Sequence, residues 1–538
     1  MRRGESDDAK AAAALGAALS RHPWRLAVAA AALALILLSL SMLNGTARGL
    51  ERRDLILADG SPVTIHRLAA QSAPRPVIVI AHGFAGSRQL MAPFALSLAR
   101  SGFIALSFDF LGHGRHRAPM TGDITKETGA TAALVAQLRS VAAFARTLPG
   151  ADGRIAFLGH SMASDIIIRA AIEENDVAAR SVEATLAVSM FSSAVTAEQP
   201  RNLLIIVGGL ERFLTEQALI AAALKPEVDE AAEGVTYGAF EAGSARRAAV
   251  SRGVDHVGVL YSRDSLAEAV AWARAAFEPG VDHAAALPAA RGAPLAVQGP
   301  WIIGLLAGLI ALAWPLAALL PRAPAPATAP PLGRGARLGL ILAPALATPL
   351  LLRPVPIDFL PVLVADYLAV HFALYGALSL AVLAWLGRAR FRLPSAPALI
   401  VATLAITLYG IGALGAAVDG FVTSYWPHPG RLSLIAALAL GAGLYAVVEA
   451  WASFDAPLWA RIGHKLAFLG SLALATALNL EDLFFLIIIF PVLPLFFLVF
   501  GLFARWAERA TGHPGPSGLA NGLVFAWALG CVFPIVAG

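Results

Sequence analysis

The sequence contains a single cysteine, Cys531, which lies in its last apolar segment. One cysteine excludes an intramolecular disulfide and a metal site built from cysteines, and it leaves the compartment undecided. Charged residues are also scarce, at 14% of the 538 residues, whereas a soluble domain carries about a quarter. Because 58% of the residues are hydrophobic, a large part of the chain is expected to contact membrane lipid.

The sequence also lacks a basic block with interleaved aromatic residues. Its formal net charge of +5 is spread along the chain, so we expect no nucleic-acid partner. The histidines form no second cluster that completes a metal site, and we expect neither a metal nor an organic cofactor. The arginines instead carry information about membrane topology.

An apolar run near the N-terminus predicts a membrane anchor. Residues 1–25 are polar, and residues 26–43 form an uninterrupted apolar run. At about 1.5 Å per residue, this run nearly spans a hydrocarbon core of roughly 30 Å. A cleaved signal peptide is the alternative, but the run is longer than a usual signal-peptide core, so we favour an uncleaved anchor.

Residues 300–538 predict a polytopic, all-α membrane domain. This part of the chain holds eight apolar segments: 301–320, 338–352, 359–386, 397–418, 432–452, 464–479, 483–503 and 519–537. The segments 338–352 and 464–479 are short, which suggests reentrant or tilted elements there. With the anchor, the sequence predicts nine spans.

The basic residues predict the orientation of these spans. If the N-terminus is cytoplasmic, ten lysines and arginines fall in inside loops and two in outside loops, a positive-inside bias. The ten are Arg322, Arg334, Arg337, Arg388, Arg390, Arg392, Arg461, Lys465, Arg505 and Arg509, and the two are Arg353 and Arg431. The segment between the first two spans then lies outside the cytoplasm, in the periplasm if the cell is Gram-negative. We predict a multi-pass protein of the cell (inner) membrane.

That segment, residues 51–285, has the pattern of a soluble α/β domain. Five short apolar runs alternate with helical patterns, and such runs are typical of parallel strands covered by helices on both faces. The runs are PVIVIAH, FIALSFDF, RIAFLGH, ATLAVSM and NLLIIVGG.

A serine stands where one of these strands meets a helix. In Gly159-His160-Ser161-Met162-Ala163, the flanking small residues permit a tight strand-to-helix turn that presents the hydroxyl beyond the sheet edge. The pattern approximates G-x-S-x-G, with alanine for the last glycine. Taken alone, Ser161 is equally well explained as a helix N-cap.

A nucleophilic serine needs a base and an orienting carboxylate. His256 lies just before the last helical pattern of the domain, and Glu211 follows the strand NLLIIVGG and a glycine turn. Asp255 is the alternative acid, although its adjacency to His256 makes side-chain pairing awkward. The alternative without a catalytic role is that Glu211 and His256 are ordinary residues of surface loops.

Residues 51–280 resemble the α/β-hydrolase superfamily. The resemblance rests on features that follow one another in the same order along the chain: His82-Gly83-Phe84, DFLGHGRH, Ser161, Glu211 and His256. The similarity is greatest to compact esterases and to dienelactone-hydrolase-like and serine-aminopeptidase-like members. The resemblance implies Ser161 as nucleophile, His256 as general base, Glu211 as acid, and the backbone N–H groups of Phe84 and Met162 as oxyanion donors. For Asp109 and His113, we favour a structural role in their loop.

The resemblance predicts a membrane-bound serine hydrolase that cleaves an ester, thioester or amide by an acyl-enzyme mechanism outside the cytoplasm. Its expected partners are a small-molecule or lipid-like acyl substrate and membrane lipids. Two alternatives remain: an acyltransferase to a lipid or glycan acceptor, and a transporter or channel with a regulatory hydrolase-like domain. The short connection 191–201 leaves no room for a cap over Ser161, which predicts either an open site or one roofed by another part of the chain, with the membrane domain as the candidate roof.

Four residues within the membrane segments carry groups that are costly to bury in lipid. Asp366, Tyr367 and His371 lie within 359–386, and Glu449 lies within 432–452. Tyr367 and His371 share one helix face at i, i+4 spacing. Polar packing between helices is the favoured explanation, and a functional site is the alternative.

Overall fold

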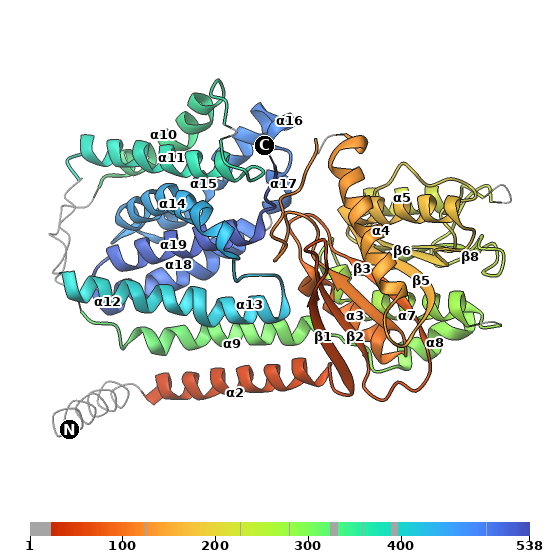
Figure 1. Cartoon of the computed structure of the whole chain (residues 1–538). Helices are drawn as coiled ribbons and strands as arrows, with labels where there is room; N and C mark the ends of the chain where they lie inside the picture. The colour runs from red at the N-terminus through yellow and green to blue at the C-terminus, as the bar shows by residue number, and fades with distance from the viewer. Residues whose placement is uncertain are drawn as a thin grey trace. The chain divides into compact units, whose positions relative to one another are not determined.

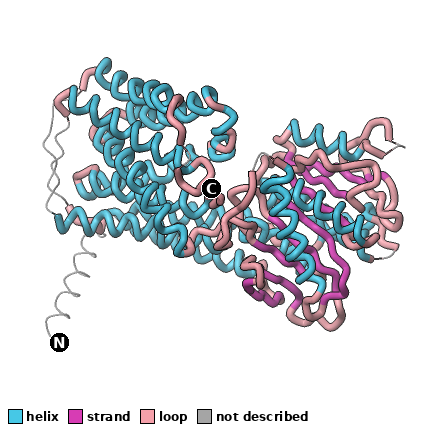
Figure 2. The backbone as a smooth tube through the Cα atoms, turned by 45° about the horizontal axis from the view of Figure 1, so that its top comes forward, coloured by secondary structure: helices cyan, strands magenta, loops and turns pink. Residues whose placement is uncertain are grey.

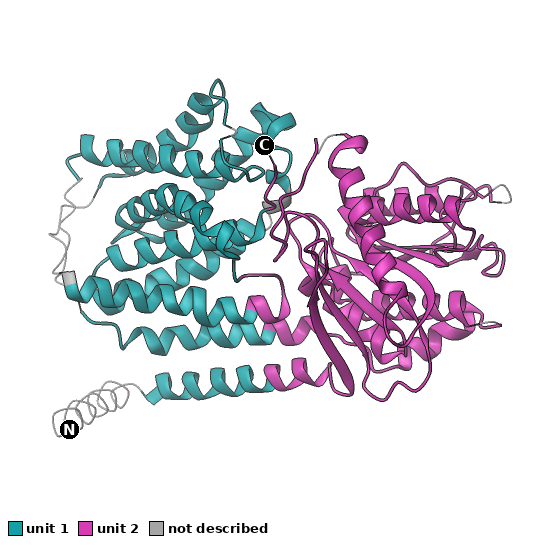
Figure 3. Ribbon diagram, viewed as in Figure 1, with its two compact units in different colours: residues 1–38, 304–417, 426–533 teal, residues 39–303, 418–425, 534–538 magenta. Residues whose placement is uncertain are grey.

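The computed structural model describes residues 23–123, 126–225, 228–278, 280–322, 332–357, 359–388, 396–490 and 492–537 (Figure 1). Most of the predicted N-terminal segment 1–25, together with Arg390 and Arg392, lies outside the described residues. The chain forms two compact units (Figure 3): unit 1 comprises Met1–Leu38, Gly304–Ala417 and Trp426–Phe533, and unit 2 comprises Ser39–Ile303, Val418–Tyr425 and Pro534–Gly538. Figure 2 shows that the strands of the described residues gather in one part of the chain, the rest being helical.

Unit 2 is built on a nine-stranded, mostly parallel sheet. The strand order is β1-β2-β4-β3-β5-β6-β7-β9-β8. The central strands β4, β3, β5, β6, β7 and β9 run parallel, whereas β1 and β2 at one edge and β8 at the other pair antiparallel. The bounds are β1 (Leu50–Ile56), β2 (Pro62–Leu68), β3 (Arg75–Ala81), β4 (Ile104–Phe108), β5 (Ala151–His160), β6 (Ala184–Val188), β7 (Leu203–Gly208), β8 (Thr236–Tyr237) and β9 (Arg246–Ser251).

Helices cover both faces of this sheet, which explains why its central strands are apolar throughout. In β3, Val77 and Val79 belong to the core on one face, and Ile78 and Ile80 belong to the core on the other; all four are fully buried. The first core includes α4 (Ala132–Arg146), α5 (Met162–Val177) and α6 (Arg212–Ala222), and the second includes α3 (Ala92–Arg100), α7 (Arg263–Phe277) and α8 (His283–Gly292). The predicted fold class is confirmed.

The five predicted strands coincide with β3 to β7, whereas β1, β2, β8 and β9 were not recognised as strands. The last parallel strand, β9, begins with Arg246 and Arg247, which interrupt its apolar pattern. Both arginines are nevertheless buried: Arg246 donates to the carbonyl of Pro200, and Arg247 forms an ion pair with Glu268 at 2.9 Å. Because both guanidinium groups have hydrogen-bond partners, β9 can bury two arginines although they depart from the apolar pattern of a buried strand.

The remaining described elements are helical. Their bounds are α2 (Pro23–Gly45), α9 (Gly299–Ala317), α10 (Arg334–Leu352), α11 (Ala365–Trp385), α12 (Ala396–Thr407), α13 (Gly415–Phe421), α14 (Leu432–Ser453), α15 (Leu458–Leu478), α16 (Leu480–Leu483), α17 (Leu486–Ile489), α18 (Val492–Thr511) and α19 (Gly515–Val532). The short segments 338–352 and 464–479 belong to full-length helices, α10 and α15. The interruption falls instead at 480–489, where the chain forms α16 and α17.

Seven helices in the described residues are long and apolar enough to cross a membrane, compared with the nine spans predicted. They are Pro23–Gly45, Gly299–Ala317, Arg334–Leu352, Ala365–Trp385, Pro397–Phe421, Pro429–Ser453 and Gly515–Val532. The two predicted spans that are not among them, 464–479 and 483–503, fall on α15 and on α16 to α18, and both α15 and α18 carry charged residues. Three of these charges are paired: Lys465 of α15 with Glu449 at 2.8 Å, and Arg461 of α15 with Glu508 of α18. Seven such helices are compatible with a multi-pass membrane protein.

Candidate active site

Ser161 occupies a sharp turn between β5 and α5. Its backbone has φ 54° and ψ −119°, a conformation that non-glycine residues seldom adopt. The turn requires a small residue on the strand side, because a Cβ on Gly159 would lie 2.7 Å from the carbonyl oxygen of Ala163. Ala163 itself is fully buried. The residues predicted to form the turn therefore place the Ser161 hydroxyl at the carboxyl edge of the sheet.

The structure brings Ser161, His256 and Glu211 into one hydrogen-bonded line. His256 Nε2 lies 2.9 Å from Ser161 Oγ, and His256 Nδ1 lies 2.5 Å from Glu211 Oε1. The three residues come from three different connections, after β5, β9 and β7. Such a line allows the histidine to take a proton from the hydroxyl while the carboxylate holds the opposite ring nitrogen.

The Glu211 carboxylate is fixed on its other oxygen. Oε2 accepts hydrogen bonds from Ser189 Oγ and from the backbone N–H of Gly208, both at 2.7 Å. Burial opposes ionisation of this carboxyl, but the hydrogen bonds from His256, Ser189 and Gly208 outweigh burial and lower the pKa of Glu211. Glu211 is therefore an ionised, oriented partner for His256.

The alternative acid, Asp255, is engaged elsewhere. Its Oδ1 accepts hydrogen bonds from the backbone N–H groups of Gly258 at 2.7 Å and Val257 at 3.3 Å. Asp255 thus stabilises the turn that follows it, and Glu211 occupies the position beside the His256 ring.

The turn that carries Phe84 approaches Ser161 closely. A Cβ on Gly83 would lie 3.0 Å from Ser161 Cβ, so any larger residue there would press against Ser161. Met162 is the first residue of α5, where backbone N–H groups point beyond the helix end. His82 holds the turn: its Nδ1 lies 2.8 Å from the Gly83 carbonyl, and its Nε2 accepts the Phe110 N–H at 3.1 Å. Burial lowers the pKa of His82, which keeps the ring neutral.

Asp109 joins this turn to the loop after β4. It is fully buried and accepts the backbone N–H groups of Arg88 at 2.8 Å and Arg115 at 3.0 Å, as well as the Arg88 guanidinium. His113 is also fully buried, and its Nδ1 lies 2.9 Å from the Leu111 carbonyl oxygen. Both residues have the structural surroundings expected for them.

Two segments distant in sequence complete unit 2 beside these loops. In segment 418–425, Asp419 pairs with Arg115 at 2.6 Å, and the backbone N–H of Ser424 donates to Ser87 Oγ at 3.0 Å. In segment 534–538, Val536 forms a parallel bridge with Met120. The predicted domain 51–285 therefore omits residues that support its own loops.

Sequence reasoning missed two contributors to the site. His160 lies within the turn itself, and its Nε2 donates to the His256 carbonyl oxygen at 2.9 Å. Burial lowers the pKa of His160 to about 3, so the ring remains a neutral donor. Ser189 also went unnoticed, because it lies within the run ATLAVSM that was predicted as a strand, whereas β6 ends one residue before it at Val188.

The site is open to solvent, and the connections that form it carry exposed apolar residues. The connection from β6 to β7 contains no helix or strand among residues 189–202, and the His256 side chain is 44% exposed. Four large apolar residues beside the catalytic connections are between 49% and 67% exposed: Phe191, Leu210, Phe213 and Val257.

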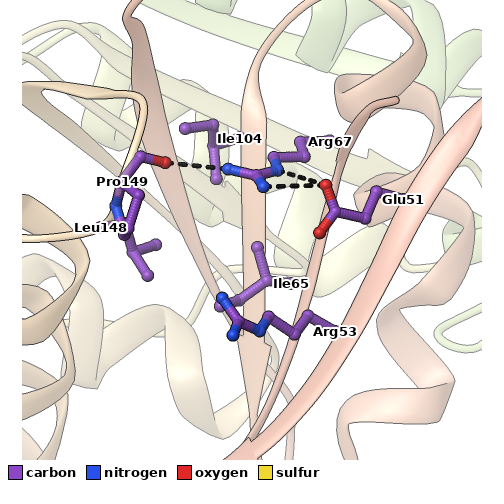
Figure 4. Close-up of a pocket in the computed structure, with 7 residues that line it drawn as sticks. All are labelled: Glu51, Arg53, Ile65, Arg67, Ile104, Leu148 and Pro149. Carbon is purple, nitrogen blue, oxygen red and sulfur yellow. Dashed lines mark hydrogen bonds and ion pairs between the residues drawn. The ribbon is translucent and has the colours of Figure 1, made fainter. Parts of the chain in front are cut away.

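A small cavity elsewhere in unit 2 lies at the opposite edge of the sheet (Figure 4). It borders Ile104 at the start of β4 and Pro149 before β5, whereas Ser161 follows the end of β5. Arg67 spans it, donating to Glu51 at 2.8 Å and to the Pro149 carbonyl at 2.9 Å. This cavity is therefore separate from the site at Ser161. Within the described ranges, no cluster of three or more His, Cys, Asp or Glu residues could hold a metal.

The polar residues singled out in the predicted membrane segments have partners. His371 Nδ1 lies 3.4 Å from the Tyr367 hydroxyl, and its Nε2 lies 3.1 Å from Ser471 Oγ of α15. Asp366 Oδ1 accepts the Tyr367 N–H at 2.7 Å. This arrangement has the form of polar packing between helices.

Comparisons with known proteins agree with the fold. Residues 72–225 match the family of serine aminopeptidases S33 (Hydrolase_4). A search of curated proteins finds no match. Among solved structures, the chain is similar to a dienelactone hydrolase from Anabaena variabilis (14% identity, TM-score 0.29, covering 45% of this chain and 96% of that chain). It is also similar to a protein from Pseudomonas aeruginosa described as hypothetical (14%, 0.28, 40% and 89%).

An epoxide hydrolase from Vigna radiata is a further similar structure, at 18% identity and a TM-score of 0.20. The similarity covers 26% of this chain and only 39% of that chain. Structural scores this low carry no argument about function, so the fold rests on the strand order and on the family match. Unit 2 of this chain is an α/β-hydrolase-like domain, and its residues 72–225 are similar to the serine aminopeptidases of family S33.

Proposed function

We propose that the protein is a membrane-bound serine hydrolase that cleaves an ester, thioester or amide through an acyl-enzyme. The observation that carries this proposal is the line from Ser161 Oγ through His256 to Glu211, at 2.9 and 2.5 Å. A hydrolase of the α/β type accounts for this line, because the fold places the three residues in the order serine, acid, histidine.

In the proposed mechanism, Ser161 Oγ attacks the acyl carbon and its proton passes to His256 Nε2. The Glu211 carboxylate stabilises the imidazolium through Nδ1–H, while the N–H groups of Phe84 and Met162 bind the oxyanion. The leaving alcohol, thiol or amine departs with the proton from His256. Water then attacks the acyl-enzyme, and His256 takes its proton and returns it to Ser161 as the acid is released.

The exposed apolar residues on these connections support an amphiphilic acyl substrate. Phe191, Leu210, Phe213 and Val257 expose apolar surface beside an uncapped site. An acyl chain that covers this surface removes it from water, and each buried CH₂ group is worth about 0.8 kcal/mol. The substrate class we propose is therefore a hydrophobic or lipid-like acyl compound.

The membrane location and the orientation belong to the same proposal. Seven apolar helices support an integral membrane protein, and the ten-to-two distribution of basic residues supports an extracytoplasmic hydrolase domain. The anchor α2 and the helix α9 precede and follow the hydrolase domain in the sequence. A domain tethered at both ends stays near the bilayer, where amphiphilic substrates are concentrated.

A fluorophosphonate probe tests the nucleophile directly. We expect the purified full chain to be labelled, with labelling lost in Ser161→Ala and retained in Ser192→Ala. Ser192 is a matched control, because its hydroxyl lies in the same region and donates to Asp165 at 2.6 Å. Absence of labelling in a well-folded wild-type protein would contradict the proposal and favour a transporter with a regulatory domain.

Acyl transfer to a lipid or glycan is the second reaction of the same acyl-enzyme. The exposed His256 and the lack of a cap favour it, since a bulky acceptor then has access to the ester bond. Product analysis with a lipid-linked substrate distinguishes the two reactions: free acid identifies hydrolysis, and an acylated acceptor identifies transfer.

A further inference from the structure

Segment 418–425 belongs to unit 2, although the chain on either side of it, 304–417 and 426–533, belongs to unit 1 (Figure 3). It contacts the turn of residues 83–87, which carries the proposed oxyanion donor Phe84 and is called the oxyanion turn below. The chain therefore brings a segment to this turn from far outside the predicted hydrolase domain.

The Ser87 hydroxyl is used by this segment and not by its own helix. Ser87 is fully buried and precedes the short helix η1 (Arg88–Met91), yet its hydroxyl caps no backbone N–H of that helix. A serine at such a position ordinarily caps the helix that follows it. Here Ser87 Oγ accepts the backbone N–H of Ser424 at 3.0 Å and lies 3.0 Å from Thr423 Oγ1. Both partners are more than 300 residues away in sequence.

Asp419 gives the segment a second attachment to the same turn. Its Oδ2 pairs with the Arg115 guanidinium at 2.6 Å, and the Arg115 backbone N–H donates to Asp109 at 3.0 Å. Asp109 in turn accepts the backbone N–H of Arg88, the residue after Ser87, at 2.8 Å. Segment 418–425 thus holds the end of the oxyanion turn by two routes.

The oxyanion turn has a backbone that depends on such support. Ala85, which follows Phe84, has φ 54°, a conformation that non-glycine residues seldom adopt. It persists only where the surroundings enforce it. Within the turn, the Gly86 N–H donates to the Gly83 carbonyl at 3.1 Å. The hydrogen bonds at Ser87 fix the far end of the turn, so they also bear on the direction of the Phe84 N–H.

We propose that Thr423 and Ser424 are positioning residues for the oxyanion donor: they hold Ser87 and thereby direct the Phe84 N–H toward the oxyanion. This assignment rests on the proposed hydrolase function. The oxyanion forms only as the reaction proceeds, so a misdirected donor weakens the transition state and not the bound substrate. Loss of the support should therefore lower kcat and leave KM unchanged.

Kinetics of the full chain in lipid nanodiscs test the assignment. Thr423→Val removes the hydroxyl and keeps the shape of the side chain, whereas Thr423→Ser keeps the hydroxyl. Ser87→Ala removes both hydrogen bonds, and the double variant Ser87→Ala/Thr423→Val tests whether the two residues act together. The active fraction of each protein is counted by fluorophosphonate labelling to completion, and kcat and KM are measured with p-nitrophenyl butyrate.

Thr147→Val is the matched control. The Thr147 hydroxyl donates to the Phe144 carbonyl at 2.8 Å, before the start of β5, whereas Ser161 follows the end of that strand. The change removes a threonine hydrogen bond from the same unit at the opposite edge of the sheet. Thr147→Val and Thr423→Ser should both match wild type in kcat and KM.

We expect kcat to fall about two- to tenfold in Thr423→Val, the effect of one hydrogen bond. It should fall further in Ser87→Ala, but by less than the loss of about 10²- to 10³-fold that removal of an oxyanion donor causes. The double variant should lose no more than Ser87→Ala, because the two single changes remove a shared bond. Effects that multiply in the double variant would contradict the assignment.

An octyl trifluoromethyl ketone reports on the oxyanion itself. Ser161 Oγ adds to its carbonyl carbon, the serine proton passes to His256, and the carbonyl oxygen becomes an oxyanion. Its inhibition constant should rise in each variant by the factor by which kcat falls. A merely structural role would lower the active fraction and leave the inhibition constant of the remaining sites unchanged.

Hydrogen exchange of residues 82–91 measures the support without turnover. Exchange should be faster in Ser87→Ala and Thr423→Val than in wild type, and unchanged in Thr147→Val. Unchanged exchange in the first two variants, or an unchanged kcat in both while wild type is labelled and active, would overturn the positioning role. A wild-type protein that is not labelled would overturn the proposed hydrolase function, and with it a role of this segment in catalysis.

Discussion

Replacing Glu211 by glutamine is the sharpest test of the proposed triad. The change keeps the size of the side chain and replaces one carboxylate oxygen by an NH₂ group. Oε2 currently accepts from the Gly208 backbone N–H and from Ser189, while Oε1 faces His256 Nδ1 at 2.5 Å. The orientation of the new amide therefore decides the outcome.

The Gly208 N–H can only donate, so the amide oxygen must remain on its side. The NH₂ group is then turned toward His256 Nδ1, which has to accept a hydrogen bond. An imidazole that accepts at Nδ1 carries its proton on Nε2, the atom 2.9 Å from Ser161 Oγ. Such a tautomer cannot take the serine proton. The same substitution at the acid of a serine triad lowers turnover about 10⁴-fold, so we expect a loss of about 10³- to 10⁴-fold in kcat/KM, or about 4 to 5.5 kcal/mol in the barrier.

Hydrolysis of p-nitrophenyl butyrate by the purified full chain measures this loss. Asp255→Asn is the matched control, because Asp255 adjoins His256 but accepts only the backbone N–H groups of Val257 and Gly258 among the described contacts. We expect Asp255→Asn to stay within tenfold of wild type, and Ser161→Ala and His256→Ala to abolish turnover. If Asp255→Asn lost far more activity than Glu211→Gln, the assignment of the acid would be wrong.

Three further predictions concern stability, topology and the role of the distant segments. Burial lowers the pKa of His66 to about 4 and that of His160 to about 3. Between these values and the unfolded value near 6.5, the unfolded chain binds more protons than the folded chain. Each histidine should therefore lower the free energy of unfolding by about 2 kcal/mol when the pH falls from 7 to 5. Thermal unfolding in nanodiscs checks this, and an acid-induced loss of the same size in His66→Gln would contradict it. An alkaline phosphatase fusion after Ala285 should be active and one after Ala327 inactive; the reverse result would invert the orientation. The isolated domain 51–285 should hydrolyse short esters but unfold at a lower temperature than the full chain and lose most activity on long-chain substrates, and equal behaviour on every substrate would leave the rest of the chain without a catalytic role.

The sequence predicted those parts of the fold in which local pattern and tertiary surroundings agree. The strands β3 to β7 are buried on both faces, so their residues form continuous apolar runs. In β1, only Leu50 and Leu55 pack toward a core, while Arg52, Arg53 and Asp54 between them stay exposed, as expected for an edge strand. In β9, the buried Arg246 and Arg247 are stabilised by partners about 20 or more residues away in sequence, which no local window can reveal.

In the candidate site, too, local sequence pattern predicts some residues and misses those whose role depends on distant partners. Ser161, Glu211 and His256 could be predicted because each follows a recognisable strand or precedes a recognisable helix. The hydrogen bonds of Ser189 and His160 could not, since they join connections 22 and 96 residues apart. The same holds for Asp419 and Arg115, which are separated by 304 residues. A sequence pattern identifies the residue at each position, whereas the hydrogen-bond partners of that residue are known only from the folded sheet.

Backbone strain lies at two of the connections that form the site. Ser161 has φ 54° and Ser189 has φ 51°, and both directly follow a strand that is buried on both faces. A left-handed conformation at a non-glycine residue costs on the order of 1–3 kcal/mol and persists only where the surroundings enforce it. Here the enforcing contacts are the Ser161 N–H to the Val188 carbonyl at 2.9 Å and the Ser189 N–H to the Ile206 carbonyl at 2.7 Å. Each bond extends the parallel ladder by one residue, so the rigidity of β5, β6 and β7 is transmitted to the hydroxyl that faces His256 and to the one that holds Glu211.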